Sequence, residues 1–173
     1  MLRVRPALVT MCAMGLVLGS CAEPTEPHAT PRADVVAQSQ PQYLQCPVDS
    51  AQSVTAQIGA LGGKLSVGNT SISIPAGAVL TPTTFTLTIP VSPYMMVDIT
   101  ANGQNGFKFL DAATVTIDYS RCPDSAIPDS PLSAWYVDAS TYAPLQFMAG
   151  VDVRDSRRVV FVTGHLSGYA IAQ

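Results

Sequence analysis

The sequence carries little charge, and the charge that is present is not basic. Among 173 residues there are 9 Lys and Arg and 12 Asp and Glu, which gives a formal net charge of -3. A nucleic-acid-binding protein is therefore not expected, because such proteins need clustered Lys and Arg to contact phosphates. The only glutamates are Glu23 and Glu26. A coiled coil is excluded as well, because about half of its residues would be Ala, Glu, Lys, Leu and Arg at heptad spacing.

Long apolar runs are also scarce. The uncharged, mostly apolar segment 7–18 is too short for a membrane-spanning helix, which needs about 20 apolar residues, and no later segment is long and apolar enough to span a bilayer. This segment follows Arg3 and Arg5 and stops at a small-residue site around 19–21. A positive start followed by a short apolar centre is typical of an export signal, which we expect over residues 1–20.

The end of this signal resembles the lipobox of bacterial lipoproteins. Leu18-Gly19-Ser20-Cys21 has an aliphatic residue and two small residues before a cysteine. The resemblance implies that Cys21 receives a diacylglycerol on its thiol, becomes the acylated first residue after cleavage, and anchors the protein to a membrane. Ala22 follows, not Asp, which in enterobacteria-like sorting favours the outer membrane over the inner one. The alternative is an ordinary secretory signal cut near 21–22.

The next segment, 21–47, is rich in proline, with five prolines at 24, 27, 31, 41 and 47. Proline at this density prevents a helix or a central strand, so we expect a lipidated cysteine followed by a semi-extended tether. The folded domain is then expected over 48–173. His28 lies alone in the tether and is not expected to bind a metal.

The cysteines divide into two groups. Cys12 lies in the signal and Cys21 would carry lipid, so Cys46 and Cys122 remain as an even pair in an oxidising compartment. We expect these two to form a structural disulfide that closes a loop of roughly 76 residues. A metal site would need more ligands than two cysteines and one distant histidine, so no metal and no other cofactor is expected.

The remaining sequence is typical of β-strands and turns. In 84–89, Phe85, Leu87 and Ile89 fall on one face and threonines on the other, which is the alternation of a half-buried strand. Similar short segments recur to the end of the chain, separated by Gly, Pro, Asn and Asp, and no window offers a helix of three turns. About ten short strands predict an all-β fold, an antiparallel β-sandwich.

The aromatic residues are interpreted mainly as core. Trp135 and Tyr136 are neighbours, so on a strand they point to opposite faces, and we expect Trp135 inside and Tyr136 at the surface. The phenylalanines, Phe147 among them, lie in alternating contexts and are also expected in the core. We expect no aromatic platform for stacking on sugars or bases; the alternative is a modest one formed by Tyr94, Tyr136 and Tyr142.

Two segments resemble the ZU5 domain family. The first joins Gly62-Gly63 to the turn at 74–77, Ile-Pro-Ala-Gly, in which Gly77 would adopt a positive φ. The second is 165–167, His-Leu-Ser, where the family has His-Phe-Ser followed by an aromatic residue. The resemblance spans about 52–173. It implies a β-sandwich of the kind that serves as an interaction or scaffolding module.

His165 and Ser167 raise one enzymatic hypothesis. Some ZU5 relatives cut themselves, and by resemblance Ser167 would attack the carbonyl carbon of Leu166 while His165 helps to remove its proton. Leu166 replaces the expected phenylalanine, and we interpret His165 and Ser167 instead as side chains that hold the last turn by hydrogen bonds. A Gly-x-Ser-x-Gly motif is absent. We therefore expect no enzymatic activity and no catalytic residues.

These observations favour a membrane-anchored bacterial envelope lipoprotein that displays a β-sandwich interaction module. Its expected partners are the membrane, through the lipid, and a protein or a polymer of the cell envelope. The alternative is a structural envelope lipoprotein with no specific ligand.

Overall fold

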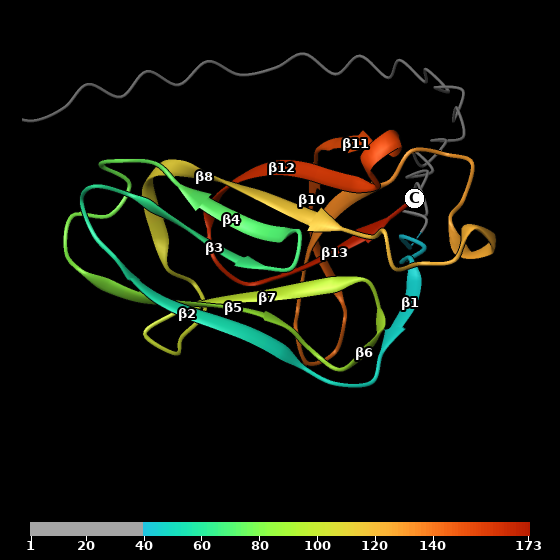
Figure 1. Ribbon diagram of the computed structural model, residues 1–173, viewed down its shortest axis with the longest axis horizontal. Coiled ribbons are helices and arrows are strands. Elements are labelled where there is room, and N and C mark those ends of the chain that lie inside the picture. Colours follow the sequence, from blue (N-terminus) through green and yellow to red (C-terminus); the bar gives the residue numbers. More distant parts are fainter. Residues whose placement is uncertain (1–39) are drawn as a thin grey trace, which may run out of the picture. The chain divides into compact units, whose positions relative to one another are not determined.

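The computed structural model describes residues 40–173 (Figure 1), so the expected signal 1–20 and Cys21 lie outside the described residues. The described part contains thirteen strands and two short 3-10 turns, η1 (Asp124–Ala126) and η2 (Arg154–Ser156). No helix of sufficient length and hydropathy to cross a bilayer occurs in residues 40–173. The strands are β1 (Gln45–Val48), β2 (Gln52–Ile58), β3 (Gly63–Val67), β4 (Thr70–Ile74), β5 (Thr83–Ile89), β6 (Ser92–Tyr94), β7 (Met96–Ala101), β8 (Lys108–Asp118), β9 (Ser133–Val137), β10 (Pro144–Ala149), β11 (Val151–Val153), β12 (Arg158–His165) and β13 (Gly168–Ala172).

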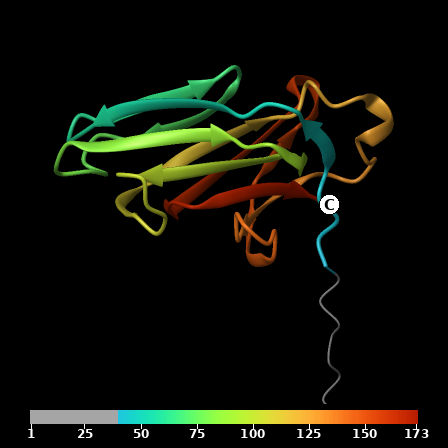
Figure 2. The same ribbon diagram turned by 90° about the horizontal axis from the view of Figure 1, so that it is seen from below.

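Two antiparallel sheets face each other and form a β-sandwich, which confirms the predicted fold class (Figures 1 and 2). The six-stranded sheet has the order β10-β9-β13-β7-β5-β2, and the five-stranded sheet has the order β11-β12-β8-β4-β3. A small third sheet, β1-β6, lies at the end of the sandwich where β13 ends. The strands β10 and β11 therefore form the edges of the two large sheets on one side.

The core between the sheets follows the predicted alternation. Phe85, Leu87 and Ile89 of β5 are buried, whereas the intervening threonines face outward. The opposite sheet contributes apolar side chains such as Val115 and Ile117 of β8 to the same hydrophobic cluster. Burial of these apolar faces is the main favourable term that holds the two sheets together.

In the first of the two segments that resemble ZU5, Gly62 and the turn at 74–77 are in close backbone contact. Gly62 has a φ of 72°, and a Cβ at this position would lie 2.7 Å from the carbonyl carbon of Pro75. The adjoining turn is fixed by the N–H of Gly77, which donates to the carbonyl oxygen of Ala60 at 2.8 Å. Gly77 has the predicted positive φ, at 83°. The two halves of the motif therefore lie against each other, and glycine is required at both positions for physical reasons.

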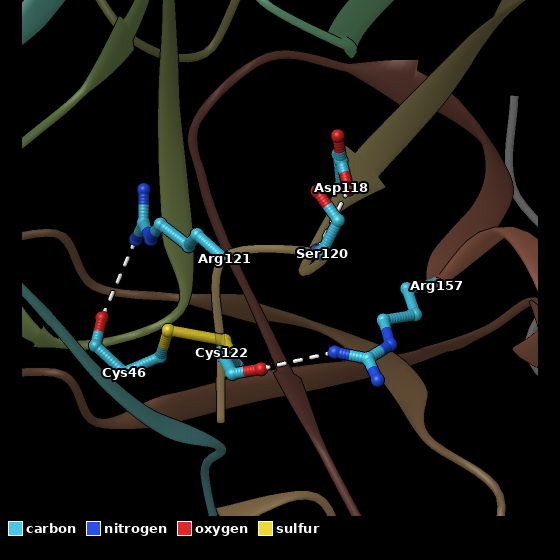
Figure 3. Close-up of a disulfide and its surroundings, with 6 residues drawn as sticks. All are labelled: Cys46, Asp118, Ser120, Arg121, Cys122 and Arg157. Carbon is cyan, nitrogen blue, oxygen red and sulfur yellow. Dashed lines mark hydrogen bonds between the residues drawn. A yellow bond between two sulfur atoms is a disulfide. The ribbon is translucent and has the colours of Figure 1, made fainter. Parts of the chain in front are cut away.

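The predicted disulfide between Cys46 and Cys122 is present, with a Cα–Cα distance of 5.4 Å. It joins β1 to the loop that follows β8, and both cysteines are buried. Two arginines reinforce the bridge from either side (Figure 3): Arg121 donates to the carbonyl oxygen of Cys46 at 3.3 Å, and Arg157 donates to that of Cys122 at 3.2 Å. The start of the domain is thereby fixed to one end of the sandwich.

The folded domain begins earlier than residue 48, the boundary predicted from the prolines. Leu44 is 3% exposed, and its N–H donates to the carbonyl oxygen of Ile171 at 2.9 Å. Tyr43 forms a β-bridge with Ala172 at the end of β13. The proline density concealed this short pairing. Pro41 precedes the bridge, and Pro47 lies where the register of β1 with β6 is irregular, between Gln45 and Val48, a place in which proline is tolerated. Residues 43–47 belong to the domain and not to the tether.

A buried carboxylate holds the long connection between β8 and β9. Asp152 of β11 has a side chain that is 2% exposed. Its oxygens accept hydrogen bonds from the hydroxyl of Tyr119 at 2.5 Å and from the N–H of Leu132 at 3.0 Å. Arg154 pairs with the same carboxylate at 2.7 Å and also donates to the carbonyl oxygen of Pro128 at 2.7 Å. Burial and the contact with Asp152 raise the pKa of Tyr119 to about 12, so its hydroxyl stays a donor.

Candidate functional site

The single tryptophan lies on the outer face of the six-stranded sheet, so the prediction that it belongs to the core is wrong. Its neighbour Tyr136 points inward instead, with its ring centroid 4.9 Å from that of His165. Trp135 stands directly opposite Phe147 of β10, and the two ring centroids are 5.1 Å apart. Alternation shows only that the two neighbours face opposite ways; the register of β9 on β13 decides which face is inside.

The prediction that Phe147 belongs to the core is wrong for a related reason. Phe147 is 54% exposed, and Leu145 on the same strand is exposed to the same extent. Both belong to β10, an edge strand whose outer face is not covered by another strand in residues 40–173. Trp135 and Phe147 line a groove of about 620 Å³, here called the Trp135 groove. Its other lining residues are Gln40, Pro41, Pro144, Leu145, Gln146 and Gln173.

Three tyrosines extend this aromatic region. The ring of Tyr94 lies 5.3 Å from that of Tyr43 and 5.3 Å from that of Tyr142. The hydroxyl of Tyr43 donates to the carbonyl oxygen of Tyr142 at 3.0 Å, and burial raises the pKa of Tyr43. Sequence reasoning brought Tyr94 and Tyr142 together correctly. It wrongly added Tyr136, and it missed Tyr43 because that residue was assigned to the tether.

The five side chains form one surface. Tyr43, Trp135 and Tyr142 pack on the outer face of the sheet against the buried residues Met96 and Ala170. Tyr94 and Phe147 extend this group at its two ends through the ring contacts described above. The term aromatic surface is used below for this set: Tyr43, Tyr94, Trp135, Tyr142 and Phe147.

A second groove adjoins the first. It has a volume of about 730 Å³, is called here the Tyr43 groove, and is lined by 41–45, Tyr94, 125–128 and Gln173. Pro41 and Gln173 line both grooves. Among the residues that the structure describes, no charged side chain lines either groove. The polar side-chain groups are a serine hydroxyl, two tyrosine hydroxyls, the indole N–H of Trp135 and glutamine amides. One of these amides, that of Gln173, donates to Gln42 at 2.6 Å.

The disulfide and the buried polar contacts described above hold both walls of the Tyr43 groove in place. Residues 125–128 belong to the connection between β8 and β9, which the disulfide holds at Cys122 and which Arg154 holds at Pro128. The opposite wall, 41–45, is held by the hydrogen bond from Leu44 to β13 and by the disulfide at Cys46. Both walls are therefore fixed to the sandwich before any ligand arrives.

The segment that contains His165 and Ser167 lies in a different place, at the turn between β12 and β13. The carbonyl oxygen of His165 accepts hydrogen bonds from the hydroxyls of Thr163, at 2.8 Å, and of Tyr169. Burial raises the pKa of Tyr169 to about 12. We expected the side chains of His165 and Ser167 to hold this turn. His165 takes part through a contact of 3.5 Å between its Nδ1 and the hydroxyl of Tyr169, whereas the bonds to its carbonyl oxygen come from Thr163 and Tyr169.

The peptide bond between Leu166 and Ser167 is part of a regular hydrogen-bonded backbone. The N–H of Leu166 donates to the carbonyl oxygen of Phe107 at 2.9 Å, and its own carbonyl oxygen accepts from Gly106 at 3.0 Å. The carbonyl oxygen of Ser167 accepts from Ile99 at 3.1 Å. Neither residue has a positive φ. Self-cleavage needs backbone strain as well as the right side chains, and these contacts describe an ordinary turn.

We expect the chain to remain uncut at this bond. The intact mass of the purified protein should correspond to a polypeptide that ends at Gln173, and Ser167→Ala should change it only by the mass of the substituted side chain. The physical reason is that Leu166 and Ser167 sit in unstrained backbone hydrogen bonds on both sides. A fragment that ends at Leu166 in the wild type and disappears in Ser167→Ala would contradict this expectation.

No group of three or more His, Cys, Asp or Glu side chains in residues 40–173 is arranged to hold a metal ion. Comparison with known proteins gives no further assignment: no protein-family model matches the chain, and no curated protein sequence matches it.

Proposed function

We propose that this protein is a lipid-anchored bacterial envelope lipoprotein whose β-sandwich binds a component of the cell envelope through the aromatic surface. The single observation that carries the binding function is a set of five uncharged aromatic side chains at the surface, of which Phe147 is exposed and the other four are half-buried. Exposed apolar patches of this kind on a folded domain are typical of interaction sites. The alternative, a structural lipoprotein without a specific ligand, does not require Phe147 and Leu145 to lie together beside a groove that the aromatic residue Trp135 also lines.

The envelope location rests on the first residues of the chain and on the disulfide. The lipobox-like segment 18–21 and the positive, apolar segment before it favour export and attachment of lipid at Cys21. A structural disulfide between Cys46 and Cys122 supports an oxidising compartment outside the cytoplasm. Two or more acyl chains anchor a protein firmly, and Ala22 favours the outer membrane. The contact of Gly62 with Pro75 supports the ZU5-like interpretation of the domain.

The anchor is tested by Cys21→Ala. This variant should lose all labelling by a fatty-acid probe and should move from the membrane fraction to the soluble fraction, because the thiol that accepts the lipid is removed. Cys12→Ala is the matched control, since that cysteine lies inside the expected signal, and its labelling should be unchanged. Persistent labelling of Cys21→Ala would exclude the lipoprotein assignment.

The binding function is tested with a matched pair of leucines. The full-length chain, in a non-glycosidic detergent, is sedimented with delipidated envelope material from the source organism. Leu145→Ala removes an exposed side chain from the Trp135 groove, whereas Leu110→Ala removes one that is 69% exposed on β8 and lines neither groove. Leu145→Ala should weaken binding by about three- to tenfold and Phe147→Ala by about tenfold or more.

The control Leu110→Ala should bind as the wild type does. If the wild type does not bind, or if all three variants bind equally well, the aromatic surface is not a binding site and the proposed function is wrong.

A further inference from the structure

We propose that the ligand of the aromatic surface is a neutral glycan; this proposal rests on the binding function proposed above and names the chemical class of its ligand. A sugar ring presents apolar C–H faces and an edge of hydroxyl groups that both donate and accept hydrogen bonds. A site that fits it offers rigid aromatic rings, neutral side-chain groups that also donate and accept, and no charged side chain. The two grooves combine these three properties.

The aromatic rings are held by the sheet and not by a mobile loop alone. Trp135 is in the second strand of the six-stranded sheet, its ring meets that of Phe147 at 60°, and the buried residues Met96 and Ala170 lie beneath the cluster. Phe147 is therefore supported from one side by Trp135 and remains 54% exposed. A flat apolar ligand can stack on it at a low cost in conformational entropy, because the ring is already positioned.

The polar groups beside the rings are predominantly amides. Gln40, Gln146 and Gln173 line the Trp135 groove, and Gln42 joins Gln173 in the Tyr43 groove. Each amide offers a carbonyl oxygen as acceptor and an NH₂ group as donor, which matches the dual character of a sugar hydroxyl. The amide of Gln173 is already oriented, because it donates to Gln42 and accepts from the hydroxyl of Ser130 at 2.6 Å.

Two charged side chains near the site are occupied by other groups. The carboxylate of Asp138, in the turn before Tyr142, accepts hydrogen bonds from Ser140 and Thr141, and these bonds lower its pKa. Arg154, behind the wall formed by 125–128, is paired with Asp152. Since no charged side chain lines either groove, an acidic polysaccharide or a nucleic acid would find no cation there.

Addition of a peptide strand to β10 is the competing mode of binding, and the sheet disfavours it. Strand addition needs a regular edge that offers its backbone groups in sequence. The register of β10 is interrupted twice, between Pro144 and Gln146 and between Phe147 and Ala149. Irregularities of this kind are a known means of protecting a sheet edge from pairing. The side chains of β10, and not its backbone, are therefore the accessible feature.

The experiment uses the full-length chain in a non-glycosidic detergent and the same delipidated envelope material after two treatments. Periodate oxidation, followed by quenching, cleaves the vicinal diols of glycans, whereas proteinase digestion, followed by inactivation, removes proteins. We expect periodate to reduce binding by at least tenfold and proteinase to leave the binding that depends on Phe147 intact. Binding that survives periodate overturns the proposal. If proteinase alone abolishes it, the partner is a protein and the proposed binding function stands without the glycan.

Charge is tested separately by competition. Polysaccharide released from the envelope is divided by anion exchange into a neutral and an acidic fraction, and each is used to displace the wild-type chain from the untreated material. We expect the neutral fraction to displace the wild type. In the same assay, displacement of Gln146→Ala should require a several-fold higher concentration of this fraction than displacement of Leu110→Ala. Displacement by the acidic fraction alone would overturn the assignment of a neutral ligand. If binding to the untreated material does not depend on the aromatic surface at all, the proposed function itself is wrong.

Discussion

Replacement of Cys46 or Cys122 by serine is expected to lower the free energy of unfolding by about 2–5 kcal/mol. The two cysteines are separated by 76 residues, and the bridge restricts the unfolded chain over this whole length. In the chain-entropy model a loop of this size corresponds to about 4 kcal/mol. Urea unfolding of the full-length chain, followed by the fluorescence of its single tryptophan, measures the loss.

The two single variants and the double variant should be equally destabilised, because each removes the same bond. Reduction of the wild type should produce a loss of similar size, which serves as a control for side-chain packing. Additive losses in the double variant, or free thiols in the unfolded and unreduced wild type, would contradict the role assigned to this disulfide.

Asp152→Ala is expected to lower the free energy of unfolding by about 3–5 kcal/mol. The carboxylate is almost fully buried and serves three partners, so its removal leaves the hydroxyl of Tyr119 and the N–H of Leu132 without an acceptor and breaks the pair with Arg154. Unpaired buried donors are costly because they have lost water as well as their partner. Thermal unfolding of the two proteins side by side would measure the difference.

Asp155→Ala is the matched control for this prediction. Asp155 is an exposed aspartate in the turn η2 that follows β11, so its replacement should leave the stability nearly unchanged. Equal effects of the two substitutions would show that the buried network does not hold the connection between β8 and β9. Asp152→Ala should also weaken binding in the Tyr43 groove, since residues 125–128 form one of its walls.

Much of the fold could be predicted from the sequence because its strands are half-buried and alternate. Phe85, Leu87 and Ile89 were placed on one buried face, and the structure agrees. The pairing of Cys46 with Cys122 followed from the number of cysteines available. The prediction of a positive φ at Gly77 was also correct, because it depended only on the backbone conformation of that residue. In each of these cases the prediction depends on neighbouring residues or on the number of cysteines.

The candidate site could not be predicted, because it depends on which face of a strand is covered. Trp135 and Phe147 occur in the same alternating pattern as true core residues, but β10 is an edge strand, and in the described part of the chain no strand lies over its outer face. Tyr43 was missed because the prolines around it suggested a tether, whereas a single β-bridge to Ala172 draws it into the fold. Sheet order and long-range pairing decide these cases, and neither is encoded in local periodicity.

The most direct test of the binding surface is the emission of Trp135, because it is the only tryptophan in the 173 residues and it lines the groove. The full-length chain is titrated with soluble polysaccharide released from the envelope, with selective excitation of tryptophan. We predict a saturable blue shift whose midpoint moves to about tenfold higher concentration in Phe147→Ala and stays unchanged in Leu110→Ala. Envelope material that sediments with the protein while the emission of Trp135 remains unchanged would show that binding occurs elsewhere.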